Sequence, residues 1–231
     1  MDSLSEYFQS FLTALESYDV VGAFWVNIQL AFWAALGSAV LGTVLALMRI
    51  SPVPSFQWVG SAYVNIFRNT PLTIIMTFCI LVLVFQLQIN LSSDFNFNFF
   101  LWAVVGLTVY HAAFVCEAIR SGVNTVPLGQ AEAARAIGLS FLPAARIIIL
   151  PQAFRGAIAP LGNTLIALTK NTTVAAAASV PEAAGLMKTM IEFRPDVILA
   201  IFATFAAGFV LIVIPIGLLT TWLSTKLAVA R

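Results

Sequence analysis

The stretch Glu132–Pro151, EAARAIGLSFLPAARIIILP, decides how this chain folds, because it sets a short run of small and polar residues between long apolar runs. Its alanines favour a helix over Leu128–Ile137, and Pro127 suits the first turn of that helix. Gly138 is suited to end the helix in a left-handed conformation, and Ser140 is suited to cap a second one. The sequence therefore predicts two short helices with a sharp bend at Gly138.

The composition around this stretch is that of a membrane protein. The chain has 231 residues, of which 61% are hydrophobic and 9% charged, with a mean hydropathy of +0.98. Soluble domains carry about 25% charged residues, so these few charges do not cover a soluble globule. The net charge of +1 gives no reason to expect nucleic-acid binding. Cys79 and Cys116 lie inside apolar runs without metal-binding spacing, and we expect no metal site.

Charge-free runs predict an all-α membrane protein with about five transmembrane helices, built as a single transmembrane domain, 1–231. Each run approaches or exceeds the ~20 residues that cross a ~30 Å hydrocarbon core. The fourth run is short and reaches crossing length only by continuing past Lys170. The five expected spans are about 21–48, 66–87, 98–119, 151–173 and 197–223.

The distribution of lysine and arginine predicts an N-out/C-in orientation, since cytoplasmic segments carry the excess of positive charge. Eight of the eleven basic residues then lie at the cytoplasmic face, and Lys170, Lys188 and Arg194 do not. The residues at that face are Arg49, Arg68, Arg120, Arg135, Arg146, Arg155, Lys226 and Arg231. The same orientation places Glu132 and its loop in the cytoplasm.

The spacing from Glu132-Ala133-Ala134 through Gly138 to Ile148-x-Leu150-Pro151 resembles the EAA loop of permease subunits in bacterial ABC importers. This resemblance implies a type I ABC importer permease fold with a cytoplasmic coupling helix. The loop of about 125–151 would then transmit the motion of an ATPase to the membrane spans. The residues expected to couple to the ATPase are Gly129, Glu132, Ala133, Ala134, Arg135 and Gly138.

Further motifs resemble the polar amino acid branch of these permeases. Residues 67–72, FRNTPL, are similar to F-R-G-T-P-L with Asn69 in place of glycine. Residues 112–122, AAFVCEAIRSG, are similar to A-A-Y-x-x-E-x-x-R-G-G. Residues 170–174, KNTTV, are similar to K-D-[ST]-[ST]-L, and Asn171 replaces the aspartate. This replacement removes a carboxylate partner for Lys170 within the motif.

The resemblance implies a multi-pass subunit of the bacterial plasma membrane that moves a polar amino acid, such as glutamate, glutamine or another acidic or neutral one. Its partners would be an ATPase subunit dimer, a second permease subunit that is a paralogue or an identical copy, and an extracytoplasmic amino-acid-binding protein. The chain has no G-x-x-x-x-G-K-[ST] loop, so ATP and Mg would bind to the ATPase partner and this chain would bind no cofactor.

Polar residues within the predicted spans are candidates for a substrate path, because ionisable groups at membrane depth are functional candidates by default. His111 either lines that path or forms a hydrogen bond between helices. Lys170 either meets a substrate carboxylate or satisfies the carbonyls of a broken helix. Asn69 and Thr70 either cap the second span or lie near an inner gate. The full candidate set is Asn69, Thr70, His111, Lys170, Asn171, Thr172 and Thr173.

Two other groups of polar residues have structural interpretations. Glu117 and Arg120, three residues apart, are expected to form an ion pair, and Asn27 and Gln29 are expected to join helices. Three other functions are alternatives to an amino acid permease. The same architecture can move another small solute, such as a di-anion or methionine, and a non-ABC polytopic membrane protein would not need the spacing at 132–151. An intramembrane enzyme is disfavoured, because the chain has no HExxH, no GxSxG and no metal-spaced histidine and cysteine set, so we expect no catalytic residue.

Overall fold

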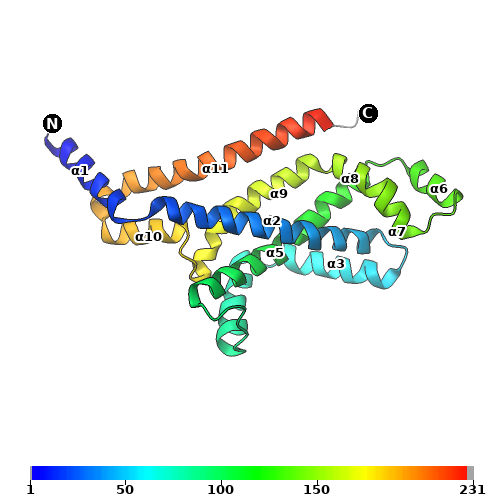
Figure 1. Cartoon of the computed structure of the whole chain (residues 1–231), viewed down its shortest axis with the longest axis horizontal. Helices are drawn as coiled ribbons and strands as arrows, with labels where there is room; N and C mark the ends of the chain where they lie inside the picture. The colour runs from blue at the N-terminus through cyan, green and yellow to red at the C-terminus, as the bar shows by residue number, and fades with distance from the viewer. Residues whose placement is uncertain (1, 228–231) are drawn as a thin grey trace.

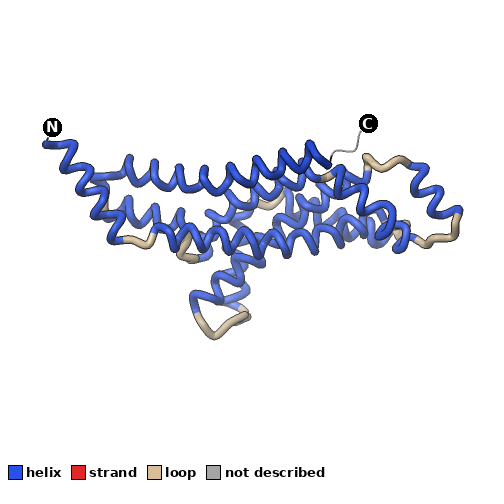
Figure 2. Tube along the Cα trace, turned by 45° about the horizontal axis from the view of Figure 1, so that its top comes forward, coloured by secondary structure: helices blue, strands red, loops and turns tan. Residues whose placement is uncertain are grey.

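The structure, a computed structural model, describes residues 2–227, within which every regular element is a helix (Figures 1 and 2). Arg231, one of the basic residues expected at the cytoplasmic face, lies outside the described residues. The elements, with π- and 3₁₀-helices labelled η, are α1 (Asp2–Ser17), α2 (Val20–Ile50), α3 (Pro54–Arg68), α4 (Leu72–Thr77), η1 (Phe78–Gln86), α5 (Phe95–Val123), α6 (Leu128–Ala136), α7 (Phe141–Ala144), η2 (Ala145–Ile149), α8 (Leu150–Gly156), α9 (Ile158–Asn171), η3 (Thr172–Ala178), α10 (Ala183–Phe193), η4 (Pro195–Val197) and α11 (Ile198–Leu227).

The long helices α2 and α11 and the shorter α9 run along the length of the molecule, and α5 crosses behind α2 (Figure 1). The most extensive packing joins α2 to α5, and α11 packs mainly on α9. Helices α1 and α10 lie at one end of the bundle, whereas α6 and α7 lie at the opposite end (Figure 1). The core between α2, α5 and their neighbours is apolar, and Leu30, Met76 and Leu107 are fully buried in it.

Three helices are long and apolar enough to cross a membrane, namely α2, α5 and the helix that ends the described chain, α11. Two further pairs of helical segments pass the same test together, but each pair is bent. The segments 54–68 and 72–86 meet at 99°, and the segments 141–156 and 158–178 meet at 65°. If each bent pair forms one span, the total is five. The all-α membrane class predicted from the sequence is confirmed.

The bend at residues 69–71 falls inside the second predicted span, 66–87. The prediction therefore started the straight helix too early, before the bend. Pro71 explains the bend, since proline disfavours a helical conformation in the residue before it. Asn69 and Thr70 do not cap the helix that follows. Their side chains donate to the carbonyls of Asn65 (2.7 Å) and Ile66 (2.8 Å) in the last turn of α3. The prediction of an N-terminal cap is therefore wrong, and these residues close the preceding helix.

The second bend lies at Ala157, between α8 and α9. Pro160 is in the first turn of α9, where its missing N–H is not needed, so it begins this helix rather than breaking it. Glycines bring the neighbouring helices close together on both sides of the bend. A Cβ at Gly122 of α5 would lie 2.1 Å from the carbonyl oxygen of Ala153, and one at Gly162 would lie 1.7 Å from Thr220 of α11. These close contacts fix how α8 and α9 pack on α5 and α11.

Candidate functional site

The loop at residues 125–151 forms the two short helices that the sequence predicts. Helix α6 is followed by Gly138 at φ +85°, the left-handed conformation that glycine adopts without steric cost. Ser140 occupies the cap position of α7, but its side chain makes no capping hydrogen bond. Its carbonyl instead accepts from the N–H of Ala144 at 3.1 Å. The predicted bend is present, and the predicted side-chain cap is not.

The 125–151 loop lies at the end of the bundle where α6 and α7 are labelled (Figure 1). It exposes large apolar side chains. Leu128 is 83% exposed, Ile137 is 76% exposed and Leu142 is 62% exposed. Five of the six predicted coupling residues are exposed as well. These five are Gly129, Glu132, Ala133, Arg135 and Gly138.

Two further details of this loop concern Ala134 and the charges of Glu132 and Arg135. Ala134, the sixth predicted coupling residue, is buried, so it supports the packing of the loop rather than its outer surface. Glu132 and Arg135 do not pair with each other, and within residues 2–227 neither has an ion-pair partner. Both charges are therefore presented outward on α6.

A cavity of about 320 Å³ lies between α5 and α9, and two of the candidate path residues, His111 and Asn171, line it. The amide nitrogen of Asn171 lies 3.2 Å from His111 Nε2, so the imidazole joins the two helices, which is one of the two alternatives that the sequence left open. His111 is buried, and its Nδ1 has no hydrogen-bond partner in the described part of the chain. The other residues that line the cavity are Tyr110, Phe114, Asn163, Thr164 and Ala167.

The remaining candidate path residues lie outside this cavity. Lys170 is exposed in the last turn of α9, and the Thr173 hydroxyl donates to its carbonyl at 2.8 Å. Asn69 and Thr70 are at the end of α3. The structure thus brings together His111 and Asn171, which are 60 residues apart, but does not gather the whole predicted set.

Thr172 belongs to a separate polar group, which we call the asparagine cluster and define as Asn27, Thr172 and Glu182. The Asn27 amide donates to the Thr172 hydroxyl (2.9 Å) and to a Glu182 carboxylate oxygen (2.8 Å), and its own oxygen accepts from the N–H of Ala183 (2.8 Å). Glu182 also accepts from the N–H groups of Ala184 and Gly185. All three side chains are at most 1% exposed. The cluster joins α2 to η3 and α10, as the sequence indicated for Asn27.

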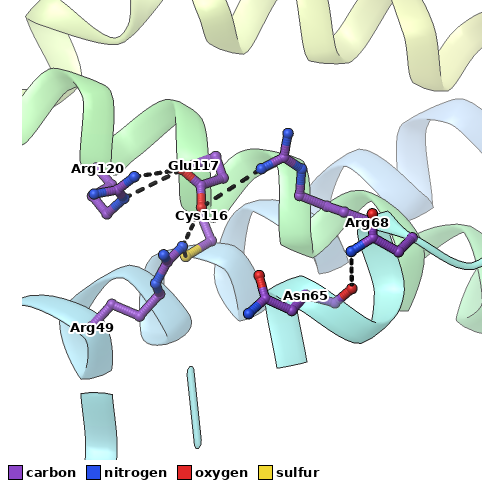
Figure 3. A network of polar contacts seen from close by, with 7 residues as sticks. Arg49, Asn65, Arg68, Cys116, Glu117 and Arg120 are labelled. Carbon is purple, nitrogen blue, oxygen red and sulfur yellow. Dashed lines mark hydrogen bonds and ion pairs between the residues drawn. The ribbon is translucent and has the colours of Figure 1, made fainter. Parts of the chain in front are cut away.

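A second polar group, the arginine cluster, consists of Arg49, Arg68, Glu117 and Arg120 (Figure 3). One carboxylate faces three guanidinium groups. Arg49 donates to Glu117 Oε1, and Arg120 donates to Oε2 at 3.1 Å and 3.3 Å. Arg68 is 3.8 Å from Oε1 without a hydrogen bond, and its guanidinium lies 5.6 Å from the centroid of the Phe114 ring.

The pair between Glu117 and Arg120 is the one that the sequence predicts. The sequence did not reveal that Arg49 and Arg68 share the same carboxylate, because α2 and α3 carry them and α5 carries Glu117. One signal was available: Arg49 and Arg68 each end a charge-free run, and Glu117 is the only acidic residue between Asp94 and Glu132. A carboxylate that follows an apolar run favours nearby basic partners.

These features define the class of the protein. It is an all-α polytopic membrane protein whose exposed, sharply bent helical loop lies at one end of the bundle. Residues 38–229 match the family model for the binding-protein-dependent transport system inner membrane component. The chain belongs to this family of ABC transporter permeases, and it is a multi-pass protein of the bacterial inner membrane.

Individual relatives agree with this assignment. The chain is 49% identical over 214 residues to a glutamate transport system permease protein, GluC, of Corynebacterium efficiens, covering 90% of this chain and 94% of the relative. It is 43% identical over 141 residues to a probable glutamine ABC transporter permease protein, GlnM, of Bacillus subtilis, covering 61% and 62% of the two chains. A solved amino acid ABC transporter with histidines superposes with a TM-score of 0.75 over 90% of this chain and 93% of that one, at 24% identity, which shows the shared fold.

Proposed function

We propose that this chain is the permease subunit of an ATP-driven importer for a polar amino acid, and that its 125–151 loop receives the motion of a separate ATPase. The observation that carries this proposal is the exposed apolar surface of the loop, made by Leu128, Ile137 and Leu142. Exposed apolar surface at one end of a membrane bundle favours contact with a partner protein. The similarity to amino acid permeases supports the same function.

The shape of the loop suits the transmission of force. Gly138 turns the chain sharply without steric cost, so α6 and α7 meet at a fixed angle. Helix α8 follows η2 directly and packs against α5. A displacement of α6 would therefore reach α5 through packed helices, as in other rigid-body transitions. This chain would hydrolyse no ATP itself, and ATP with Mg would remain on the ATPase.

We place the substrate path at the cavity between α5 and α9. Its volume, about 320 Å³, lies at the lower end of the range of about 300–1,000 Å³ that small-molecule sites occupy. The unpartnered His111 Nδ1 and the amides of Asn163 and Asn171 offer hydrogen bonds to a polar amino acid. Lys170 lies in the last turn of α9 and would supply a positive charge near this path in an assembled transporter.

The partners follow from the family and from the surface of the chain. A binding protein would deliver the amino acid from outside, and an ATPase dimer would lie beneath the 125–151 loop. Helix α11 leaves large apolar side chains exposed, among them Leu199, Leu211 and Leu218. This face would contact lipid and a second permease subunit, which is either a paralogue or an identical copy. A permease for another small solute is the alternative.

Purification through a tag on this chain, in mild detergent from its own membranes, tests the proposal. Mass spectrometry should identify an ATPase subunit in the complex, and a second permease chain would establish a heteromer. The variant Ile137→Glu should lose the ATPase because it places a charge on the exposed apolar surface, whereas Ile137→Val should keep it. A well-folded wild-type preparation without any ATPase, or an Ile137→Glu complex that retains it fully, would contradict the role of the loop.

A further inference from the structure

An apolar groove lies between α7 and the turn that joins α2 to α3, at the end of the bundle where these elements meet (Figure 1). Its volume is about 480 Å³, and no charged side chain lines it. Helix α7 packs mainly on η2, so it does not close the groove against α2. Val44, Phe56 and Leu142, which line the groove, are all exposed. An apolar surface of this kind marks a site where another molecule binds.

The groove crosses the boundary of the predicted membrane layer. The first predicted span ends at residue 48, so Val44 and Leu47 belong to the span, whereas Val53 follows it. Trp58 in α3 is 73% exposed near the same boundary, and tryptophan is enriched at membrane–water interfaces. A partner protein in the cytoplasm could not reach the part of the groove within the span. One acyl chain of a phospholipid can, because it enters from the hydrocarbon side.

The charge beside the groove is positive. Arg146 follows Leu142 by four residues in the helical segment 141–156, so the two side chains share one face. Arg146 is exposed and has no ion-pair partner in the described part of the chain. The two stretches of sequence that form the groove, 20–93 and 133–181, contain no acidic residue. The surroundings of the groove therefore favour an anionic headgroup over a neutral one.

We infer that the groove binds one acyl chain of an anionic phospholipid of the cytoplasmic leaflet, and that Arg146 pairs with its phosphate. The chain alone would gain little, because the surrounding lipid tails are as apolar as the groove. The guanidinium adds the preference, since its planar donors match the oxygens of a phosphate. The bound lipid would fill the space between α7 and α2. This inference goes beyond the proposed function, because it concerns a ligand other than the transported amino acid.

Two phospholipids with the same dioleoyl chains, phosphatidylglycerol and phosphatidylcholine, provide the test. The complex purified in detergent through a tag on this chain is titrated with each lipid, and native mass spectrometry gives the apparent Kd. Arg146→Gln should weaken the binding of phosphatidylglycerol by about fivefold, the contribution of one basic residue near a membrane surface. It should affect phosphatidylcholine less, because the choline charge offsets the phosphate. Arg155→Gln, which removes another exposed arginine, should change neither lipid.

A second pair of variants tests the acyl chain. Val44→Phe fills the groove, so it should weaken the binding of both lipids alike. Val40→Phe enlarges an exposed side chain one turn earlier on α2 that does not line the groove, and it should leave both lipids unchanged. Glycerol phosphate, which has the phosphate without the chains, should not compete with phosphatidylglycerol. The two pairs are independent, so either one tests the inference if a variant of the other does not assemble.

Several results would overturn the inference. Equal losses in Arg146→Gln and Arg155→Gln would mean that general surface charge attracts the lipid. Equal losses in Val44→Phe and Val40→Phe would mean that the chain lies outside the groove, and competition by glycerol phosphate would mean that the chain is not needed. A wild-type complex without preference for phosphatidylglycerol would mean that a protein subunit covers the groove. None of these measurements uses ATP or uptake, so each result leaves the proposed function intact.

Discussion

The asparagine cluster and the arginine cluster use polar side chains in opposite ways. In the asparagine cluster every side chain is at most 1% exposed, and Asn27 and Glu182 use their polar atoms in hydrogen bonds within the chain. In the arginine cluster Arg68 and Arg120 are nearly half exposed, and one carboxylate serves three guanidinium groups. A satisfied, buried network fixes an arrangement of helices. A partly exposed network of ion pairs adds little stability.

The largest effect should come from Glu182→Ala. This change removes the acceptor for one Asn27 hydrogen bond and for two N–H groups at the start of α10. We expect a loss of about 2–3 kcal/mol in the free energy of unfolding, because buried donors lose their partner. Thermal unfolding in detergent measures it, with the exposed Glu192→Ala as a control that should change stability by less than about 0.5 kcal/mol. Equal stability of Glu182→Ala and Glu192→Ala would contradict the stabilising role of the asparagine cluster.

A smaller effect is expected from Thr172→Val, which keeps the shape of the side chain and removes its hydroxyl. That hydroxyl accepts from Asn27 at 2.9 Å and donates to the Thr169 carbonyl at 2.7 Å. We expect a cost of about 1–1.5 kcal/mol in the same unfolding assay. Thr173→Val, in the same 3₁₀-helix, loses one bond to a local carbonyl and should cost less. A larger loss of stability for Thr173→Val than for Thr172→Val would contradict the assignment of Thr172 to the asparagine cluster.

A substitution in the arginine cluster should hardly change the free energy of unfolding in the same assay. Arg120→Gln removes one of the ion pairs of Glu117, but Arg49 still donates to this carboxylate. Partly exposed ion pairs contribute about 0–1 kcal/mol, so we expect a change in unfolding free energy below about 0.5 kcal/mol. A loss comparable to that of Glu182→Ala would remove the distinction between the two clusters.

The smallest expected effect concerns pH. Burial raises the pKa of Glu182, which lies outside the candidate spans, above its ordinary value of 4.5, although its hydrogen bonds oppose this shift. The folded state then binds a proton more readily than the unfolded state, so the stability that this carboxyl contributes is lost as pH rises from 4.5 through the folded pKa. Glu182→Gln lacks this titration. The melting temperature of the wild type, relative to that of Glu182→Gln, should fall as pH rises, and a rise would contradict the assigned shift.

The parts of this molecule that were predictable from sequence depend on local chemistry. The left-handed bend at Gly138 follows from a glycine after a run of helix formers, and the long apolar helices follow from charge-free runs. The break before Leu72 could also have been predicted, because Pro71 disfavours a helical conformation in the residue before it. The prediction missed this break because it located the spans by charge-free runs alone.

Contacts between distant residues were not predictable in this way. Asn27 and Glu182 are 155 positions apart, and Arg49 and Glu117 are 68 positions apart. Nothing in the local pattern around either residue specifies its partner, because the packing of α2 against its neighbours decides the pairing. The same reasoning explains the candidate path residues. His111 and Asn171 meet across two helices, whereas Thr172, next in sequence, points into a different cluster.

The coupling role of the 125–151 loop is tested by amino acid uptake into liposomes that hold the complex purified through this chain, supplied with its binding protein, in the presence and absence of ATP. We expect glutamate or another polar amino acid to accumulate inside the liposomes only with ATP, and we expect Ile137→Glu to abolish this accumulation while Ile137→Val preserves it. Accumulation that is independent of ATP, or that continues unchanged in Ile137→Glu, would contradict the claim that the 125–151 loop couples an ATPase to transport.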